Sequence, residues 1–181
     1  NKLLILFIGL LILQMLVNLI GALGPERGFD ALWYHLTLPK LYLQDHSIFF
    51  IPGGLLYYSA MPKLAEMLYI AGLSFGNEIL VKLIHFSFGI LSCIALYKLQ
   101  RKFFNSFISL IGVVVFYSNL IVGWESTSSY IDLIRAFFEI MALWAFVNWW
   151  PPSRKASEGQ GKLNWLIISA IMLGLAITTK L

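Results

Sequence analysis

The sequence predicts an all-α integral membrane protein with about five transmembrane helices and juxtamembrane amphipathic helices in its first outer loop. Of the 181 residues, 59% are hydrophobic and only 12% are charged, whereas roughly a quarter of the residues of a soluble domain are charged. Several apolar runs approach the ~20 residues that a helix needs to cross a hydrocarbon core of ~30 Å. We therefore expect residues 1–181 to form a single transmembrane domain.

The first expected span covers residues 3–23, which are almost all apolar. A secretory signal peptide is the competing interpretation, but the run is longer than a typical h-region and lacks a clear small-x-small cleavage pattern. We expect a retained helix. Since the chain starts at Asn1 and its last apolar run stops at Leu181, we also expect it to be the N-terminal part of a longer protein.

Residues 24–77 form an outer segment that is neither a plain span nor a solvated loop. The segment is rich in aromatic and aliphatic residues, yet it is interrupted by Pro39, Pro52, Gly53, Gly54 and Pro62. Short amphipathic helices lying in the membrane interface reconcile these two properties. We expect them to surround an acidic centre at Asp30.

Four further spans are expected at residues 78–97, 106–123, 130–150 and 163–179. The second span is followed by the basic cluster Lys98, Arg101 and Lys102. The fourth ends in Trp144, Trp149 and Trp150, as the aromatic belt of a membrane interface would require. Residues 151–162, PPSRKASEGQGK, are the plainly solvated loop of the chain.

The orientation follows from the basic residues of the loops. With five spans, one side of the membrane receives Lys2, Lys98, Arg101, Lys102, Arg154, Lys155 and Lys162. That side is cytoplasmic by the positive-inside rule, so residues 24–77 face the periplasm or the exterior of the cell (inner) membrane. The net charge of +4 reflects these loops, and we expect membrane lipids rather than nucleic acid as partners.

Asp30 is the first candidate for chemistry. A helix starting near Asp30 would place Tyr34 one turn further on, with His35 beside it. A carboxylate just outside the first span can act as a base, but an aspartate at this position is also a common helix N-cap. The residues alone leave both interpretations open.

Asp132 is the second candidate. Asp132, Arg135 and Glu139 share one face of the fourth span, and ionisable groups inside a membrane are costly enough to suggest function. The alternative is an internal ion pair in which Arg135 neutralises Asp132 or Glu139. Asp132 lies at the outer end of its helix, on the same side as Asp30.

Two lysines could bind a phosphate at the outer face. Lys82 lies one turn after Glu78 in the second span, and Lys180 follows the fifth. An ammonium near carboxylates can stabilise a phosphate leaving group. The alternatives are a Glu78–Lys82 pair along the helix and an ordinary interfacial anchor at Lys180. No zinc-ligand spacing, Gly-rich phosphate loop or serine-nucleophile motif is present.

The sequence resembles the GT-C-type membrane glycosyltransferases, in particular the group of the protein O-mannosyltransferases and the aminoarabinose transferase of lipid A. The similar stretches are FDALWYHLTLPKLYL, VKLIHFSFGILSCIALYKLQRKFF, SSYIDL and LGLAITTKL. An Asp-Glu pair is frequent at the first acidic site of the family, where this chain has Asp30 followed by Ala31. Family enzymes contain further spans.

The resemblance implies sugar transfer from a polyprenyl-phosphate donor to an acceptor hydroxyl, with Asp30 and Asp132 in the catalytic cavity. Asp30 would act as a general base, or would hold a divalent metal together with Asp132; ligands with oxygen only favour Mg²⁺, Mn²⁺ or Ca²⁺. The substrate-binding residues would be Tyr34, His35, Lys82, Arg135 and Lys180, of which the cationic ones would neutralise the phosphate.

Two other classes of protein fit parts of the pattern. A transporter or channel-like protein would use Asp132, Arg135 and Glu139 as an ion path, although transporters usually break helices near the midplane and show repeated halves. A lipid-handling subunit without catalysis would keep the amphipathic segment but would not need Asp30.

Overall fold

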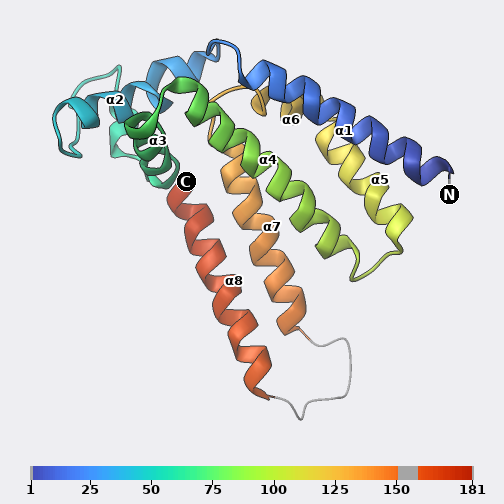
Figure 1. The fold of residues 1–181 in the computed structure, drawn as a ribbon. Coiled ribbons are helices and arrows are strands. Elements are labelled where there is room, and N and C mark those ends of the chain that lie inside the picture. Colours follow the sequence, from blue (N-terminus) through green and yellow to red (C-terminus); the bar gives the residue numbers. More distant parts are fainter. Residues whose placement is uncertain (1, 151–158, 181) are drawn as a thin grey trace.

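The computed structural model describes residues 2–150 and 159–180, and this part of the chain is all helical. Long helices fan out from one end of the molecule, where the short helices gather (Figure 1). The helices that correspond to the expected spans are α1 (Lys2–Ala22), α4 (Glu78–Gln100), α5 (Ser106–Tyr117), α6 (Leu120–Glu125), α7 (Asp132–Trp149) and α8 (Gly159–Thr179). The outer segment folds into the π-helix η1 (Ala31–His35), α2 (Thr37–Gln44), the 3-10 helix η2 (Tyr57–Ala60) and α3 (Leu64–Phe75).

Helices α1 and α4 are long and apolar enough to cross a membrane. Within α1 only Asn18 and Ala22 are buried, so its apolar side chains face outward, as they would toward lipid. Helix α4 instead packs against α7, α5, α3 and α1. The described part of the chain is therefore all helical with two candidate membrane-spanning helices, and a total of five spans stays a prediction.

Asparagine side chains fix the starts of three helices. Asn77, Asn105 and Asn119 accept hydrogen bonds from backbone N–H groups two or three residues further on, at 2.9, 3.0 and 2.9 Å. Asparagine is among the best N-cap residues because its oxygen satisfies one of the four unpaired N–H groups of the first turn. The cap at Asn77 explains why α4 begins at Glu78, as the sequence predicted.

The third expected span, residues 106–123, is not one continuous helix in the structure. Helix α5 ends at Tyr117, and the extended backbone of Asn119 (ψ 133°) separates it from α6. The cap at Asn119 starts a new helix there, so the apolar run is divided. At 1.5 Å per residue α5 is only about 18 Å long, shorter than the hydrocarbon core.

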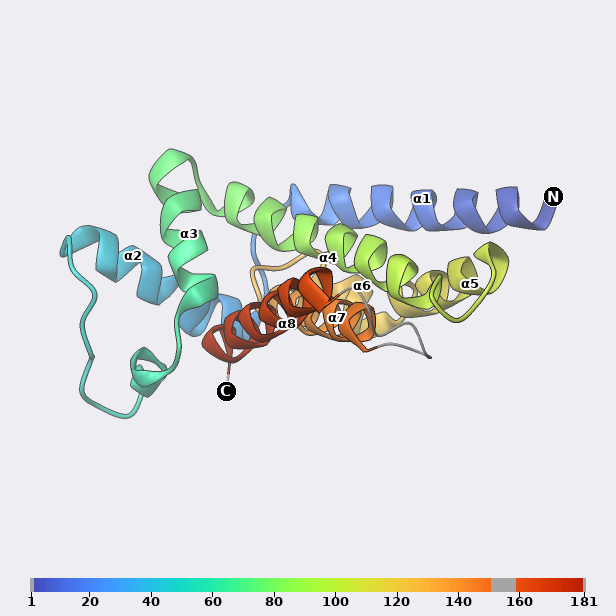
Figure 2. The same cartoon turned by 90° about the horizontal axis from the view of Figure 1, so that it is seen from below.

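One end of the molecule collects the parts that bear on function. The last turns of α1 and α8 and the first turns of α4 and α7 meet η1, α2 and α3 there (Figure 1 and Figure 2). A buried apolar cluster joins the junction of η1 and α2 to α3, α4 and the start of α7; it contains Leu36, Ala65, Tyr69, Val81, Ile131 and Ile134. We call this end the site end. The basic residues Lys98, Arg101 and Lys102 lie at the opposite end, where α4 turns into α5.

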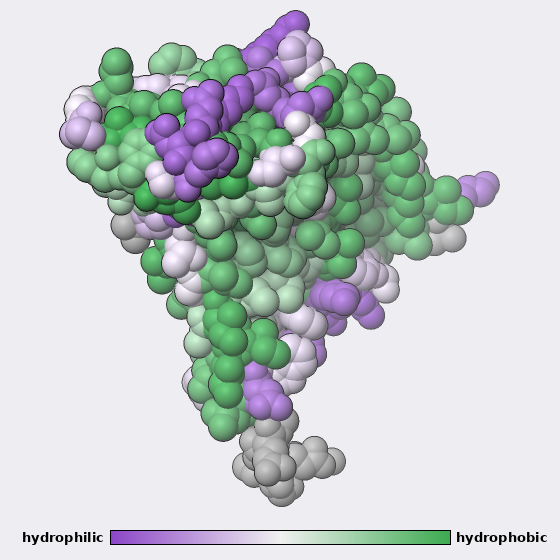
Figure 3. Space-filling view, turned by 60° about the vertical axis from the view of Figure 1, so that its left-hand side comes forward, coloured by the Kyte–Doolittle hydropathy of each residue, from purple (hydrophilic) through white to green (hydrophobic). Residues whose placement is uncertain are grey.

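The surface follows the same division. Much of the surface below the site end is hydrophobic, whereas hydrophilic side chains gather across the site end in this view (Figure 3). An apolar flank below a polar cap is the distribution expected of a protein with its long helices in lipid and its outer segment in the interface.

Candidate active site

Glu26 joins the chain around Asp30 to the start of α7. Its Oε1 accepts hydrogen bonds from the N–H groups of Arg27 and Gly28 and from Ser128 Oγ, each at 2.7 Å. Its Oε2 accepts from the N–H and the Oγ of Ser129, at 2.7 and 2.6 Å. Burial favours a higher pKa, but the hydrogen bonds outweigh it and hold the pKa of Glu26 below its usual value. Glu26 therefore stays ionised.

Gly28 lies where the loop before Asp30 packs against Ser128 and Tyr130. A Cβ atom at this position would come within 2.5 Å of Ser128 Oγ and 2.6 Å of a Tyr130 ring carbon. Only glycine allows this approach of the two backbones. The loop that carries Asp30 is thus held against the turn that precedes Asp132.

Asp30 immediately precedes the π-helix η1 and makes no side-chain cap hydrogen bond. Its carboxylate instead accepts a hydrogen bond of 3.3 Å from the hydroxyl of Tyr34, one turn further on. The capping interpretation is therefore wrong for this carboxylate. Burial, followed by the charge of Asp30 and more weakly that of Asp132, raises the pKa of Tyr34. Both carboxylates thus act on this one hydroxyl, which remains a donor.

His35 and Glu66 form a buried pair between η1 and α3. His35 Nδ1 lies 2.9 Å from Glu66 Oε1, and the two residues are only 1% and 5% exposed. The other polar atom of each side chain, His35 Nε2 and Glu66 Oε2, is buried and has no hydrogen-bond partner among the described residues. Unpaired buried polar atoms are costly and require an explanation, such as a catalytic or binding role or a bound water.

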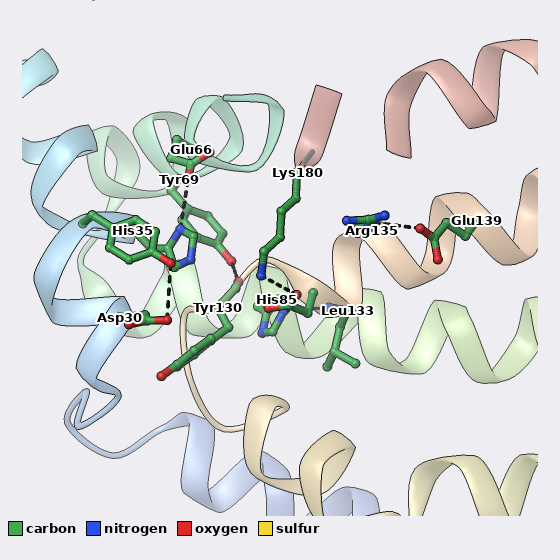
Figure 4. A network of polar contacts seen from close by, with 12 residues as sticks. Asp30, His35, Glu66, Tyr69, His85, Tyr130, Leu133, Arg135, Glu139 and Lys180 are labelled. Atoms are coloured by element: carbon green, nitrogen blue, oxygen red, sulfur yellow. Dashed lines mark hydrogen bonds and ion pairs between the residues drawn. The ribbon is translucent and has the colours of Figure 1, made fainter. Parts of the chain in front are cut away.

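Asp132 and Lys180 connect α7 with the end of α8. Lys180 Nζ lies 2.8 Å from Asp132 Oδ1, and both side chains are partly exposed. Asp132 stands at the N-terminus of α7 and Lys180 directly after the last residue of α8, where the helix dipoles favour these charges. Figure 4 shows Lys180 extending from α8 toward the space beside Tyr130 and His35.

A cavity of about 100 Å³ lies between these groups. Its wall is formed by η1, η2, α3 and the facing ends of α7 and α8, through Tyr34, His35, Tyr58, Met61, Pro62, Glu66, Ile131, Thr179 and Lys180. Asp30 and Asp132 border this wall, since each is hydrogen-bonded to one of its residues, Tyr34 and Lys180. We call this the outer cavity.

The structure places two of the expected substrate-binding residues elsewhere. Arg135 pairs with Glu139 at 2.7 Å, and Figure 4 shows this pair further along α7, apart from the outer cavity. Lys82 is 1% exposed, and its ammonium donates to the carbonyl groups of Gly21, Gly24 and Pro25 at 3.1, 2.8 and 3.3 Å. It thereby satisfies carbonyls at the end of α1. Glu78, an alternative partner of Lys82, binds Lys40 instead.

His85 and Glu125 lie beside the site. His85 Nδ1 faces the carbonyls of Ser128 and Glu125 at 2.8 and 3.0 Å, and its Nε2 accepts from the N–H of Leu133 at 3.2 Å. It is a structural hydrogen bonder. Burial and the charge of Asp132 raise the pKa of Glu125 to about 7, although Lys180 opposes this shift.

A metal ion finds few ligands among the described residues. No group of three or more His, Cys, Asp or Glu side chains is placed there to hold an ion. Asp30 and Asp132 each already accept a hydrogen bond. They do not form a complete metal site on their own, and we derive no catalytic step through a metal.

Sequence reasoning missed Glu26 and Glu66. They are 103 and 31 positions away from their partners Ser129 and His35, so no local spacing could have paired them. The available signal was weaker: both are carboxylates in an outer segment that is otherwise rich in apolar residues.

Residues 62–181, more than half of the chain, match the model of a glycosyltransferase family described as dolichyl-phosphate-mannose-protein mannosyltransferase. The chain belongs to this GT-C family of mannosyltransferases, which confirms the resemblance noted in the sequence. The matched range contains Glu66, Asp132 and Lys180, whereas Asp30 and His35 precede it. Comparisons with curated proteins and with solved structures found no match.

Proposed function

We propose that the protein transfers a sugar from a polyprenyl-phosphate donor to an acceptor hydroxyl, and that the outer cavity is the place of transfer. The main support for this proposal is that Asp30, Asp132 and Lys180, which come from three distant parts of the chain, lie in or beside the wall of one cavity. A basic group beside carboxylates, in a partly apolar wall, suits a reaction in which a hydroxyl attacks and a phosphate departs.

Asp30 is the proposed general base. Its carboxylate is half-buried and has a hydrogen bond from Tyr34, so part of it remains free to accept the proton of an acceptor hydroxyl. A hydroxyl is a poor nucleophile until this proton is removed. Tyr34, on the wall of the cavity, would orient the carboxylate and contact the substrate.

Lys180 is the proposed phosphate ligand. It lies on the wall of the outer cavity with its ammonium on Asp132. A leaving phosphate could take over part of this contact, with Asp132 holding the ammonium in place before the donor binds. We leave Lys82 out of the phosphate site because three carbonyls already engage its ammonium. Arg135 would join only if its pair with Glu139 opened.

A divalent ion remains a proposal for the assay to test. Asp30 and Asp132 could hold Mg²⁺, Mn²⁺ or Ca²⁺ only with further oxygen ligands, such as those of the donor phosphate. Treating the membranes with a chelator and restoring each ion in turn separates this role from general-base catalysis, because a base alone needs no ion.

We further propose that the site end faces the periplasm or exterior of the inner membrane. Its support is the position of Lys98, Arg101 and Lys102 at the opposite end of α4, the end that the positive-inside rule assigns to the cytoplasm. The donor and acceptor would then meet at the outer interface, beside the amphipathic helices of residues 24–77.

The test is sugar transfer in membranes supplied with polyprenyl-phosphate sugar, with Asp30→Asn compared with the parent protein at equal expression. The matched control is Asp45→Asn, an exposed carboxylate at the end of α2. Loss of a general base lowers rates by about 10²–10⁴-fold, so we expect this loss for Asp30→Asn only. Full activity of Asp30→Asn would refute the role of Asp30 and would direct the search to Asp132 and Glu125.

A further inference from the structure

His35 and Glu66 belong to the wall of the outer cavity, and no step of the proposed reaction uses them. Both side chains are more than nine-tenths buried, and each has one satisfied and one unsatisfied polar atom. Figure 4 shows His35 between Glu66 on one side and Asp30 and Lys180 on the other. A ligand in the outer cavity would therefore lie against both side chains, and a rotation of either could bring its unpaired atom to the ligand.

The hydrogen bond within the pair defines what such a ligand must offer. When His35 donates its Nδ1 proton to Glu66 Oε1, the carboxylate presents Oε2 as an acceptor, and the ring presents Nε2 as an acceptor or a donor, either of which a hydroxyl group can match. A ligand with two O–H groups satisfies both. Leaving them unpaired in a buried site is unfavourable, so the pair discriminates in favour of hydroxyl donors.

The charge of Glu66 disfavours an anion at its part of the wall. The ammonium of Lys180, the proposed phosphate ligand, is instead paired with Asp132 on the α7 and α8 side of the cavity. The portion of a ligand that lies against His35 and Glu66 should thus be hydroxylated and free of negative charge.

Two stacked tyrosines, Tyr34 and Tyr58, form part of the remaining wall. Tyr34 and Tyr58 stack with ring centroids 3.9 Å apart, Tyr57 stacks on Tyr58 at 4.1 Å, and the edge of Trp33 meets Tyr58 at 5.3 Å. Locked aromatic rings offer flat apolar surface at little entropic cost. A volume of about 100 Å³ exceeds the ~30 Å³ share of one water molecule several-fold. A sugar ring combines the hydroxyl groups and apolar C–H faces that such a wall would bind.

We propose that His35 and Glu66 form a sugar-hydroxyl subsite that binds two hydroxyl groups of a sugar ring in the outer cavity. This inference rests on the proposed function and deepens it. The pair binds and positions the ring; it does not take part in the bond changes, which involve Asp30 and the phosphate. The sugar can come from the donor lipid or from a glycosidic acceptor, and the binding experiment below distinguishes these two sources.

The experiment measures binding to the purified full-length protein in detergent. The probes are polyprenyl-phosphate mannose, bare polyprenyl phosphate, and methyl α-mannoside added to the bare lipid. The variants are Glu66→Gln and His35→Asn, with Glu78→Gln as the matched control, because Glu78 is partly exposed and pairs with Lys40 outside the outer cavity. Binding of the bare lipid also reports whether each variant is folded.

We expect the wild-type protein to bind the mannosyl lipid at least about tenfold more tightly than the bare lipid, the ratio for one good hydrogen bond. Glu66→Gln and His35→Asn should reduce this ratio toward one, and Glu78→Gln should preserve it. If only methyl α-mannoside shows the Glu66-dependent binding, the subsite exists and serves an acceptor sugar.

Equal affinity of the wild-type protein for both lipids, with no binding of methyl α-mannoside, would overturn the inference. A sugar preference that survives in Glu66→Gln would overturn it as well. Failure of the proposed function gives a different result, since the protein would then prefer the mannosyl lipid but transfer no sugar in membranes.

Discussion

Replacing Glu26 by glutamine tests whether one buried carboxylate holds the two halves of the site together. Glutamine keeps the size of the side chain but replaces one oxygen with an NH₂ group. Whichever way the amide is turned, the NH₂ group faces a backbone N–H, either that of Ser129 or those of Arg27 and Gly28. At least one buried donor therefore loses its partner.

The expected cost follows from these contacts. A hydrogen bond to a charged group contributes ~1.5–3 kcal/mol, and an orphaned buried donor costs ~1–3 kcal/mol. Since the remaining bonds also lose their charge, Glu26→Gln should destabilise the fold by about 3–5 kcal/mol. For a domain of this size ~1 kcal/mol shifts the melting temperature by ~2–4 °C, which predicts a decrease of about 6–20 °C.

The dependence on pH provides an internal check. Because the pKa of Glu26 is lowered in the folded protein, its contribution is fully present above the unfolded value of 4.5 and is lost as the pH falls through the lower folded value. The difference between wild type and Glu26→Gln should be full at pH 7 and smaller in acid.

The assay is thermal unfolding in detergent at several pH values, with Glu78→Gln as the control for loss of a carboxylate. Equal melting temperatures of wild type and Glu26→Gln at pH 7, within about 2 °C, would refute the reasoning, since ~3 kcal/mol cannot be hidden in so small a shift. A large difference that did not change with pH would show that ionisation of Glu26 is not its cause.

Three further changes have defined outcomes. Lys82→Met should lower the melting temperature while the KM for the donor lipid stays unchanged, because the ammonium serves carbonyls of α1; a raised KM without destabilisation would instead indicate phosphate binding. Glu125→Gln should raise the melting temperature above that of wild type at pH 8 but not at pH 4. The pKa of Glu125 is raised to about 7 in the folded protein, so its ionisation destabilises the fold as the pH rises above 4.5. Equal melting temperatures of the two proteins at pH 8 would contradict this. Labelling of intact cells with an impermeant maleimide tests the proposed orientation: Asp45→Cys, at the site end, should react, and Lys102→Cys, at the opposite end, should not. The reverse result would mean that the site end faces the cytoplasm.

Those parts of the fold that depend on local pattern could be predicted from the sequence. Apolar runs located α1, α4, α7 and α8 to within a few residues, because bilayer-length hydrophobicity and N-caps are local properties. The break at Asn119 was missed since an asparagine within an apolar run can either cap a helix or be tolerated inside one. The structure resolved this by the hydrogen bond from Ile121.

The same reasoning could predict only some of the residues of the candidate site. Asp30, Asp132 and Lys180 could be placed on one side, because each follows or precedes the end of an expected span. Their partners could not be predicted: whether Lys180 or Arg135 would reach Asp132 depends on how α7 and α8 pack, and the His35–Glu66 pair depends on how α3 folds back over η1. Such contacts between distant parts of the chain produce no periodic pattern in the sequence.

The pair of Asp132 and Lys180 imposes an order on biosynthesis. Lys180 is made 48 positions after Asp132, so at ~5–20 residues per second the ribosome adds it roughly 2–10 s later. The carboxylate at the start of α7 has no cation from α8 during that interval, and leaving it unpaired near lipid is costly. If α7 and α8 are spans, as the sequence predicts, their entry into the bilayer as a hairpin would avoid this cost, and the cavity acquires its ammonium only when α8 arrives.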